Sequence, residues 1–259
     1  MIESRANSEP VRQTEKLVPY DCVIVSVDGQ SLVESVNGVE VANFLNVARQ
    51  IDVLTRTGAR PVLVTSGADL MGMHLTTDIG LAGASDLQRQ GFAAIGQPEI
   101  MRLWNASFQS VVSGTDKPPL HLGQVLPTTH NYKPLTKHLL EQGHVPVICP
   151  DPNTDGDKTA LEVANMMDAD AFVMLTNSKG VIEETGGTVY RIEPDMINEL
   201  EQSIPKIGEM KPKLTSAGSF ASKPGNRAVI APIFHPDAII SPLRTRHGPW
   251  TVIELRRNR

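Results

Sequence analysis

Three short segments combine residue types that could bind and transfer an anionic group. The first, Ser66-Gly67-Ala68, follows a buried apolar run, so its small side chains and backbone amides would project where a strand ends. Backbone N–H groups of such a turn, with those of a helix that begins beyond it, bind anions. Taken alone, a Ser-Gly turn is common, and a purely structural turn is the simpler interpretation.

The second and third segments carry charge just before apolar helices. Asp155-Gly156-Asp157 could orient a lysine at a phosphate site, although capping of the helix N-terminus explains the same residues. The segment 208–214 places Lys211 and Lys213 at a helix start. A lysine there could reach a transferring phosphoryl group and offset its developing charge, whereas a solvated loop explains the local sequence equally well.

Other kinds of site have little support in the sequence. The net charge of −5 offers no broad positive surface for a nucleic acid. The two cysteines, Cys22 and Cys149, are expected in core strands as reduced thiols, and the seven histidines show no metal-ligand spacing. We therefore predict no metal site built by the protein itself.

The composition, with 40% hydrophobic and 20% charged residues, allows a sizeable core in a soluble globular protein. No apolar run reaches the length of a membrane span, and the polar N-terminal residues contain no signal-peptide centre. We expect a cytoplasmic protein without membrane contact. Residues 1–20 show no sustained periodicity and are expected to form a flexible arm.

From residue 21 onward, apolar runs typical of buried strands alternate with residues at helical spacing. This order predicts a mostly parallel sheet covered by helices. The predicted strands are 22–27, 61–65, 120–126, 145–149, 171–176, 227–232 and 251–255, with a short strand pair near 188–192. The predicted helices contain residues 41–51, 100–104, 135–140 and 160–167, a polar stretch ending near Pro205, and a short helix opened by Lys213. The carboxyl end of one strand, Thr176-Asn177-Ser178, lies where an open α/β sheet would hold a ligand.

In this order, the segments resemble the glutamate 5-kinases of the amino acid kinase family. The resemblance covers about residues 20–255 and is carried by VLVTSGA at 62–68, GFAAIGQPEIMRLWNASF at 91–108, HLGQVL at 121–126, VPVIC at 145–149, DGDKTALEVANMMDADAFVMLTNSKGV at 155–181 and GEMKPKL at 208–214. It implies one domain over 21–259, a three-layer α/β/α sandwich with an open, mostly parallel sheet. The substrate side would occupy about 21–150 and the nucleotide side about 151–259.

The resemblance also implies a homo-oligomer that uses ATP and Mg²⁺ to phosphorylate the carboxylate of a small amino acid, giving an acyl phosphate for proline synthesis. It implies a role for each matching residue. Lys213 and Asp157 would be catalytic, while Ser66, Gly67, Ala68, Asp155 and Gly156 would bind the amino acid. The nucleotide would be bound by Gly29, Gln30, Thr176, Asn177, Ser178, Gly208, Met210 and Lys211.

The chain departs from the family pattern at the end of the first strand. The family places a lysine there, whereas this sequence has Ser26, with Asp28 close by. Gly156 stands where the family has an Asn in the substrate loop, and Asn177 stands where an Asp is expected after Thr176. The loop expected to be acidic, at 150–153, has the sequence PDPN. One hypothesis is a kinase in which another lysine, Lys211 or Lys179, supplies the missing charge. The alternatives are a pseudokinase that binds a small anion and a regulatory subunit that pairs with an active homologous kinase.

Overall fold

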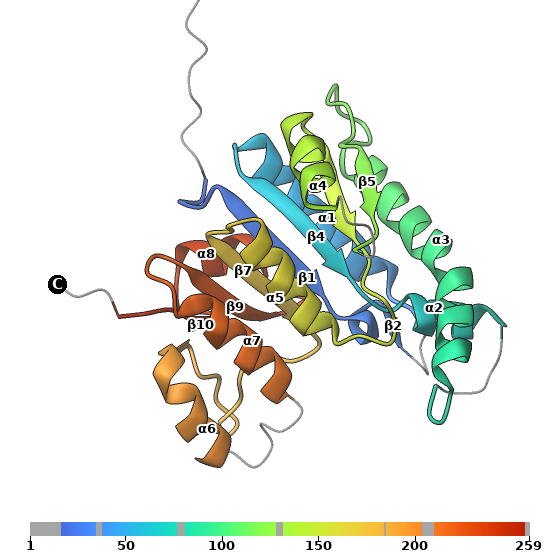
Figure 1. Cartoon of the computed structure of the whole chain (residues 1–259). Coiled ribbons are helices and arrows are strands. Elements are labelled where there is room, and N and C mark those ends of the chain that lie inside the picture. Colours follow the sequence, from blue (N-terminus) through green and yellow to red (C-terminus); the bar gives the residue numbers. More distant parts are fainter. Residues whose placement is uncertain are drawn as a thin grey trace, which may run out of the picture.

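The computed structural model describes residues 17–34, 38–76, 81–127, 132–183, 185–203 and 210–256. These residues form an eight-stranded sheet with the strand order β5-β6-β4-β1-β7-β9-β10-β8 (Figure 1). The residues at 1–16 of the expected arm lie outside the described residues. Val18 and Tyr20, near the end of that segment, are buried in the core beside the sheet.

The sheet is mostly parallel, as predicted. Its strands are β1 (Cys22–Val27), β4 (Arg60–Thr65), β5 (Leu122–Val125), β6 (Val145–Ile148), β7 (Ala171–Thr176), β8 (Arg191–Ile192), β9 (Arg227–Pro232) and β10 (Thr251–Ile253). Within this sheet, β9 and β10 are the antiparallel pair, and the other neighbours run parallel. Every residue of the central strands β1, β7 and β9 is buried, which explains their continuous apolar runs.

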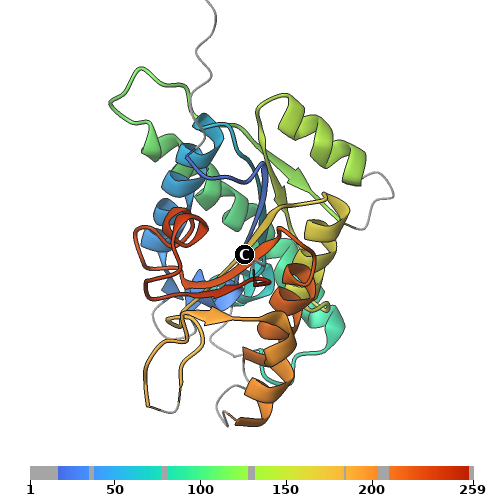
Figure 2. The same cartoon turned by 90° about the vertical axis from the view of Figure 1, so that its left-hand side faces the viewer.

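Helices cover both faces of the sheet, so the three-layer sandwich is confirmed (Figure 2). Alternate residues of β1 point to opposite faces: Val25 packs in one core with Phe44 and Trp104, and Ile24 packs in the other with Leu214. The first face is covered by α1 (Val41–Arg56), α3 (Asp86–Val111) and the short α8 (Ile240–Arg244). The second is covered by α4 (Tyr132–Glu141), α5 (Gly156–Met166), α6 (Ile197–Ser203) and α7 (Lys211–Ala221).

The helix α2 (Ala68–Thr76) is held against α3 at backbone contact distance. A Cβ placed on Gly96 would lie 2.0 Å from the carbonyl oxygen of Ala68, and one on Gly72 would lie 1.8 Å from that of Phe92. These glycines therefore allow α3 to position the start of α2, which follows directly on the turn at Ser66. The long α3 itself begins with a capping box between Ser85 and Gln88.

Short elements were not predicted from the sequence, namely α2, α8 and the hairpin of β2 (Val33–Glu34) and β3 (Gly38–Val39). The helix expected to open at Lys213 begins two residues earlier, with Pro212 in its first turn. Cys22 begins β1 and Cys149 follows β6, and both are buried free thiols. Over the described ranges, no helix combines the length and the apolar character that crossing a bilayer requires.

Candidate active site

Two adjoining clefts lie at the carboxyl edge of the parallel strands. Because β1, β4, β6 and β7 run in the same direction, the loops that follow them meet at this edge. One cleft has a volume of about 300 Å³ and the other about 250 Å³. They share Asp28, Gln30, Ser66 and Gly156, so the turns after β1 and β4 and the start of α5 separate them.

Ser66 joins the loops that follow β1 and β4. Its Oγ accepts a hydrogen bond from the backbone N–H of Gly29 at 2.9 Å and donates one to the carbonyl oxygen of Val27 at 3.3 Å. The predicted turn after the strand is thus confirmed, and hydrogen bonds of Ser66 hold it against the loop that follows β1. Gly67, with φ of 92°, adopts a backbone conformation that favours glycine, and Ala68 then begins α2.

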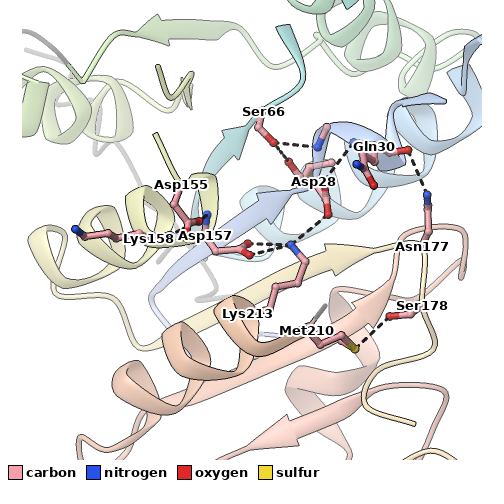
Figure 3. A network of polar contacts seen from close by, with 12 residues as sticks. Asp28, Gln30, Ser66, Asp155, Asp157, Lys158, Asn177, Ser178, Met210 and Lys213 are labelled. Carbon is pink, nitrogen blue, oxygen red and sulfur yellow. Dashed lines mark hydrogen bonds and ion pairs between the residues drawn. The ribbon is translucent and has the colours of Figure 1, made fainter. Parts of the chain in front are cut away.

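Lys213 lines the smaller cleft. Its Nζ is 2.9 Å and 3.1 Å from the two carboxylate oxygens of Asp157 and 3.2 Å from Oδ2 of Asp28 (Figure 3). The side chains are mostly buried, with exposed fractions of 13% for Lys213, 15% for Asp157 and 29% for Asp28. The two catalytic candidates are therefore in direct contact, and Asp28 completes the group.

The charges of this group influence one another. Burial works against the charge of Lys213, but attraction to Asp28 and Asp157 outweighs it and raises the pKa of the amine. Burial also raises the pKa of Asp157, and Lys213 offsets only part of that rise. Lys213 is therefore a charged ammonium at neutral pH, held inside the protein at the rim of the sheet.

Asp155 caps the helix that carries Asp157. The Oδ1 of Asp155 accepts hydrogen bonds from the backbone N–H groups of Asp157 at 2.9 Å and Lys158 at 3.3 Å. Gly156 begins α5 and lies next to Ser66 where the two clefts adjoin. Asp155 thus caps the helix, as the capping interpretation predicts, and Asp157, two residues on, contacts the lysine.

The residues expected on the nucleotide side lie next to this group (Figure 3). Asn177, just after β7, donates a hydrogen bond from Nδ2 to the carbonyl oxygen of Gln30 at 3.2 Å. Ser178 Oγ donates to Met210 Sδ at 3.7 Å. Thr176, the last residue of β7, is buried at the same edge. Gly208 lies outside the described residues.

The two lysines considered as replacements for the missing cation lie elsewhere. Lys211 and Lys179 are both exposed, and neither lines either of the two clefts. Around the smaller cleft, Lys213 supplies the positive charge while Ser26 lines the wall as a neutral residue. Of the chain that the structure describes, no group of three or more His, Cys, Asp or Glu side chains could hold a metal ion.

Sequence reasoning did not select Arg89, which lines the larger cleft. Arg89 of α3 is 3.5 Å from Oδ2 of Asp69 and donates a hydrogen bond to the carbonyl oxygen of Pro152 at 3.3 Å. It is the positively charged side chain among the described residues that line this cleft, where Asp151 is also present. Nothing in the local sequence around Arg89 indicated this position. Asp28 had a usable signal, since it directly follows an apolar strand and precedes a glycine.

Sequence comparison identifies related proteins. The sequence model described as the amino acid kinase family matches residues 21–232. A glutamate 5-kinase from Shewanella amazonensis is 28% identical over 254 residues, covering 85% of this chain and 63% of that protein. Another, from Syntrophus aciditrophicus, is 26% identical over 214 residues, covering 75% of this chain and 53% of that protein. The chain thus spans between half and two thirds of the length of these relatives.

Solved structures share the architecture at low sequence identity. Carbamate kinase from Giardia superposes with a TM-score of 0.67 at 14% identity, covering 91% of this chain and 99% of that one. N-acetylglutamate synthase from Neisseria gonorrhoeae gives a TM-score of 0.66 at 19% identity, covering 91% of this chain and 62% of that one. These two likenesses concern the fold alone.

Proposed function

This chain belongs to the amino acid kinase family, and on that premise we propose that it is an ATP-dependent phosphotransferase acting on the carboxylate of a small, glutamate-like amino acid. The observation that carries the proposal is the buried ammonium of Lys213, held by Asp157 at the rim of the sheet. Phosphoryl transfer is catalysed mostly by positioning and by positive charge next to the transferring group. Lys213 would supply that charge.

The larger cleft is the proposed place of the amino acid. Its volume of about 300 Å³ falls within the range of small-molecule sites. Ser66, Gly67 and Gly156 line it, and Ser66 and Gly156 also line the cleft of Lys213, so an acceptor carboxylate bound beside them would face the ammonium. The acyl phosphate product would serve proline synthesis, and a cytoplasmic homo-oligomer is the proposed form of the enzyme.

The residues present fit a nucleotide, with one opposing feature. Gln30, Asn177, Ser178 and Met210 would hold it beside β7, and Lys213 would contact its phosphates. The described residues offer no cage for a metal ion, so Mg²⁺ would be held through the phosphates, where it supplies neutralising charge. The opposing feature is Asp28, whose carboxylate lines the same cleft.

An assay of the purified protein with ATP, Mg²⁺ and glutamate tests the proposal. We expect ADP release together with a hydroxamate from the trapped acyl phosphate, and loss of both in Lys213→Ala. Lys158→Ala is the matched control, because Lys158 is exposed and points away from Lys213 (Figure 3). Turnover that is equal in the wild type and Lys213→Ala would overturn the assignment.

A second candidate function is supported by Ser26 and Asp28, which stand where the resemblance expects a lysine. In that case the protein binds a small anion, or pairs with an active homologous kinase, without transferring phosphate. A thermal-shift screen with nucleotides and amino acids distinguishes the two functions. A rise in melting temperature without turnover favours binding, and co-purification with a second, lysine-complete kinase favours the regulatory subunit.

A further inference from the structure

The Lys213 ammonium is held between two carboxylates. It donates hydrogen bonds to both oxygens of Asp157, at 2.9 and 3.1 Å, and forms an ion pair with Oδ2 of Asp28, at 3.2 Å. An incoming anion therefore competes with these carboxylates for the amine. Binding of a phosphate by Lys213, the role that the resemblance implies, therefore competes with the contacts of Lys213 to Asp157 and Asp28.

Asp28 is the weaker of the two partners. Asp157 contacts the amine through both oxygens and is 15% exposed, whereas Asp28 uses one oxygen and is 29% exposed. A carboxylate that is more exposed and held by a single contact costs less to separate from the ammonium, because water replaces the lost interaction.

The backbone of Asp28 can stay in place while its side chain moves. Its N–H donates to the carbonyl oxygen of Leu175 at 3.3 Å, and its carbonyl oxygen accepts from Ser31. Its Oδ1 caps the short helix at Gly29–Ser31 through the N–H of Gln30, at 3.2 Å. The cap gives the carboxylate a second partner at the cleft wall, so releasing the lysine does not leave it without any hydrogen bond.

The charge of the cleft makes this competition costly for an anion. The side chains of Asp28, Asp155 and Asp157 line it together with the one ammonium of Lys213. Asp155 is engaged in capping α5 and Asp157 in holding the lysine. Asp28 is thus the carboxylate that both neutralises the lysine and repels an approaching phosphate.

We propose that Asp28 is a positioning residue. Its carboxylate binds the ammonium of Lys213 in the free protein and must separate from it before a phosphate group can bind there. The proposal rests on the proposed function for the identity of the anion, but the contacts that carry it are independent of any turnover. Its consequence is that this protein binds phosphate more weakly than the Lys213 ammonium alone would allow.

Calorimetric titration with inorganic pyrophosphate and with ATP tests the proposal. Asp28→Asn keeps the shape and the capping oxygen but removes the charge, so we expect about tenfold tighter binding of both ligands. Asp28→Ser, which can also cap the helix, is a second variant should the first fail to fold. Equal or weaker binding by a folded Asp28 variant would overturn the proposal.

Two controls separate release of the lysine from a general change of charge. Asp155→Asn removes a carboxylate from the same cleft that does not contact Lys213, and we expect a clearly smaller gain in affinity. In a Lys213→Met background, Asp28→Asn is expected to give little gain, and a gain equal to that in the wild type would contradict the proposal. Tighter pyrophosphate binding without any acyl phosphate formation would refute the proposed function while leaving the role of Asp28 standing.

Discussion

Gly29 and Gly67 face each other across the ends of β1 and β4 with no room for a side chain on either. A Cβ built on Gly29 would lie 2.4 Å from the Cα of Gly67, and one on Gly67 would lie 2.6 Å from the Cα of Gly29. The atoms met are backbone atoms, which cannot rotate away as the end of a side chain could. The contact therefore sets the spacing of the two loops that line both clefts.

Gly29→Ala is expected to destabilise the protein by about 2 to 3 kcal/mol, since the added methyl group forces two backbones apart. Gly156→Ala, in the same part of the site, is the control. There a Cβ would meet Ser66 at 3.6 Å, an ordinary contact, and the position begins a helix. Urea unfolding of both variants checks the prediction, and similar stability losses would show that the Gly29 contact is not limiting.

Asp157 and Lys213 are expected to be strongly coupled in stability. Asp157→Ala leaves a largely buried ammonium with Asp28 as its remaining carboxylate partner, and we expect a loss of about 3 kcal/mol in the free energy of unfolding. Adding Lys213→Met to that variant should restore part of the loss, because the unpaired charge is then removed. A double-mutant cycle in urea measures the coupling, and additive losses would contradict it.

The central strands could be predicted because they are buried on both faces and are therefore mostly apolar. The strands 22–27, 171–176 and 227–232 were predicted with the bounds that the structure gives. By contrast, α2 was missed because it follows the Ser66 turn directly and is buried on several sides by its contact with α3, which hides helical periodicity. Buried strands could thus be found from their continuous apolar runs, whereas a short helix that is buried on several sides could not be found from helical periodicity.

Some residues of the candidate site could be selected from the sequence, but their arrangement could not. Lys213 and Asp157 were identified from local sequence and from the resemblance, and they do meet. The pairing of Asp28 with Lys213 joins residues that are far apart in the chain, and no local pattern encodes which carboxylate reaches the amine. Arg89 likewise reaches the larger cleft only because α3 crosses beside the loop at Pro152.

Both thiols are expected to react slowly with a disulfide reagent at pH 8. Burial raises the pKa of Cys22 to about 11 and that of Cys149 to about 12, with a hydrogen bond from Gln97 offsetting part of the latter rise. The reactive thiolate is therefore scarce in the folded protein. Cys22 should react first, because it lines a hollow of about 320 Å³ and burial raises its pKa less than that of Cys149.

Rates measured with and without urea test this expectation, and Cys22→Ser assigns the faster phase. In urea both thiols should react rapidly and in full. Rapid labelling of Cys149 in the folded protein would show that the end of β6 opens far more readily than its burial implies.

Glu254, just after β10, forms a buried ion pair with Arg227 of β9 and a second ion pair with the more exposed Arg246. Its Oε2 accepts from Arg227 at 2.9 and 2.7 Å, and its Oε1 accepts from Arg246. Burial would raise the pKa of Glu254, but the hydrogen bonds and charges of Arg246 and Arg227 outweigh it and hold the pKa below its usual 4.5. The folded state thus favours the ionised form more than the unfolded state does. This contribution to stability is complete above pH 4.5 and is lost as the pH falls through the lowered value.

Glu254→Gln is therefore expected to lower the free energy of unfolding by about 3 kcal/mol at pH 7, because it leaves Arg227 buried beside a neutral group. The difference from the wild type should narrow as the pH falls below 4.5, where the wild type also loses its carboxylate charge. Glu99→Gln is the control for this prediction. Glu99 pairs with the exposed Arg102, and the hydrogen bond from Arg102 likewise lowers the pKa of the Glu99 carboxyl. Solvent screens this surface pair, so its loss should change stability little at any pH. Urea unfolding at several pH values compares the three proteins, and a constant gap between Glu254→Gln and the wild type down to pH 3 would mean that the ion pairs of Glu254 do not carry its stabilising effect.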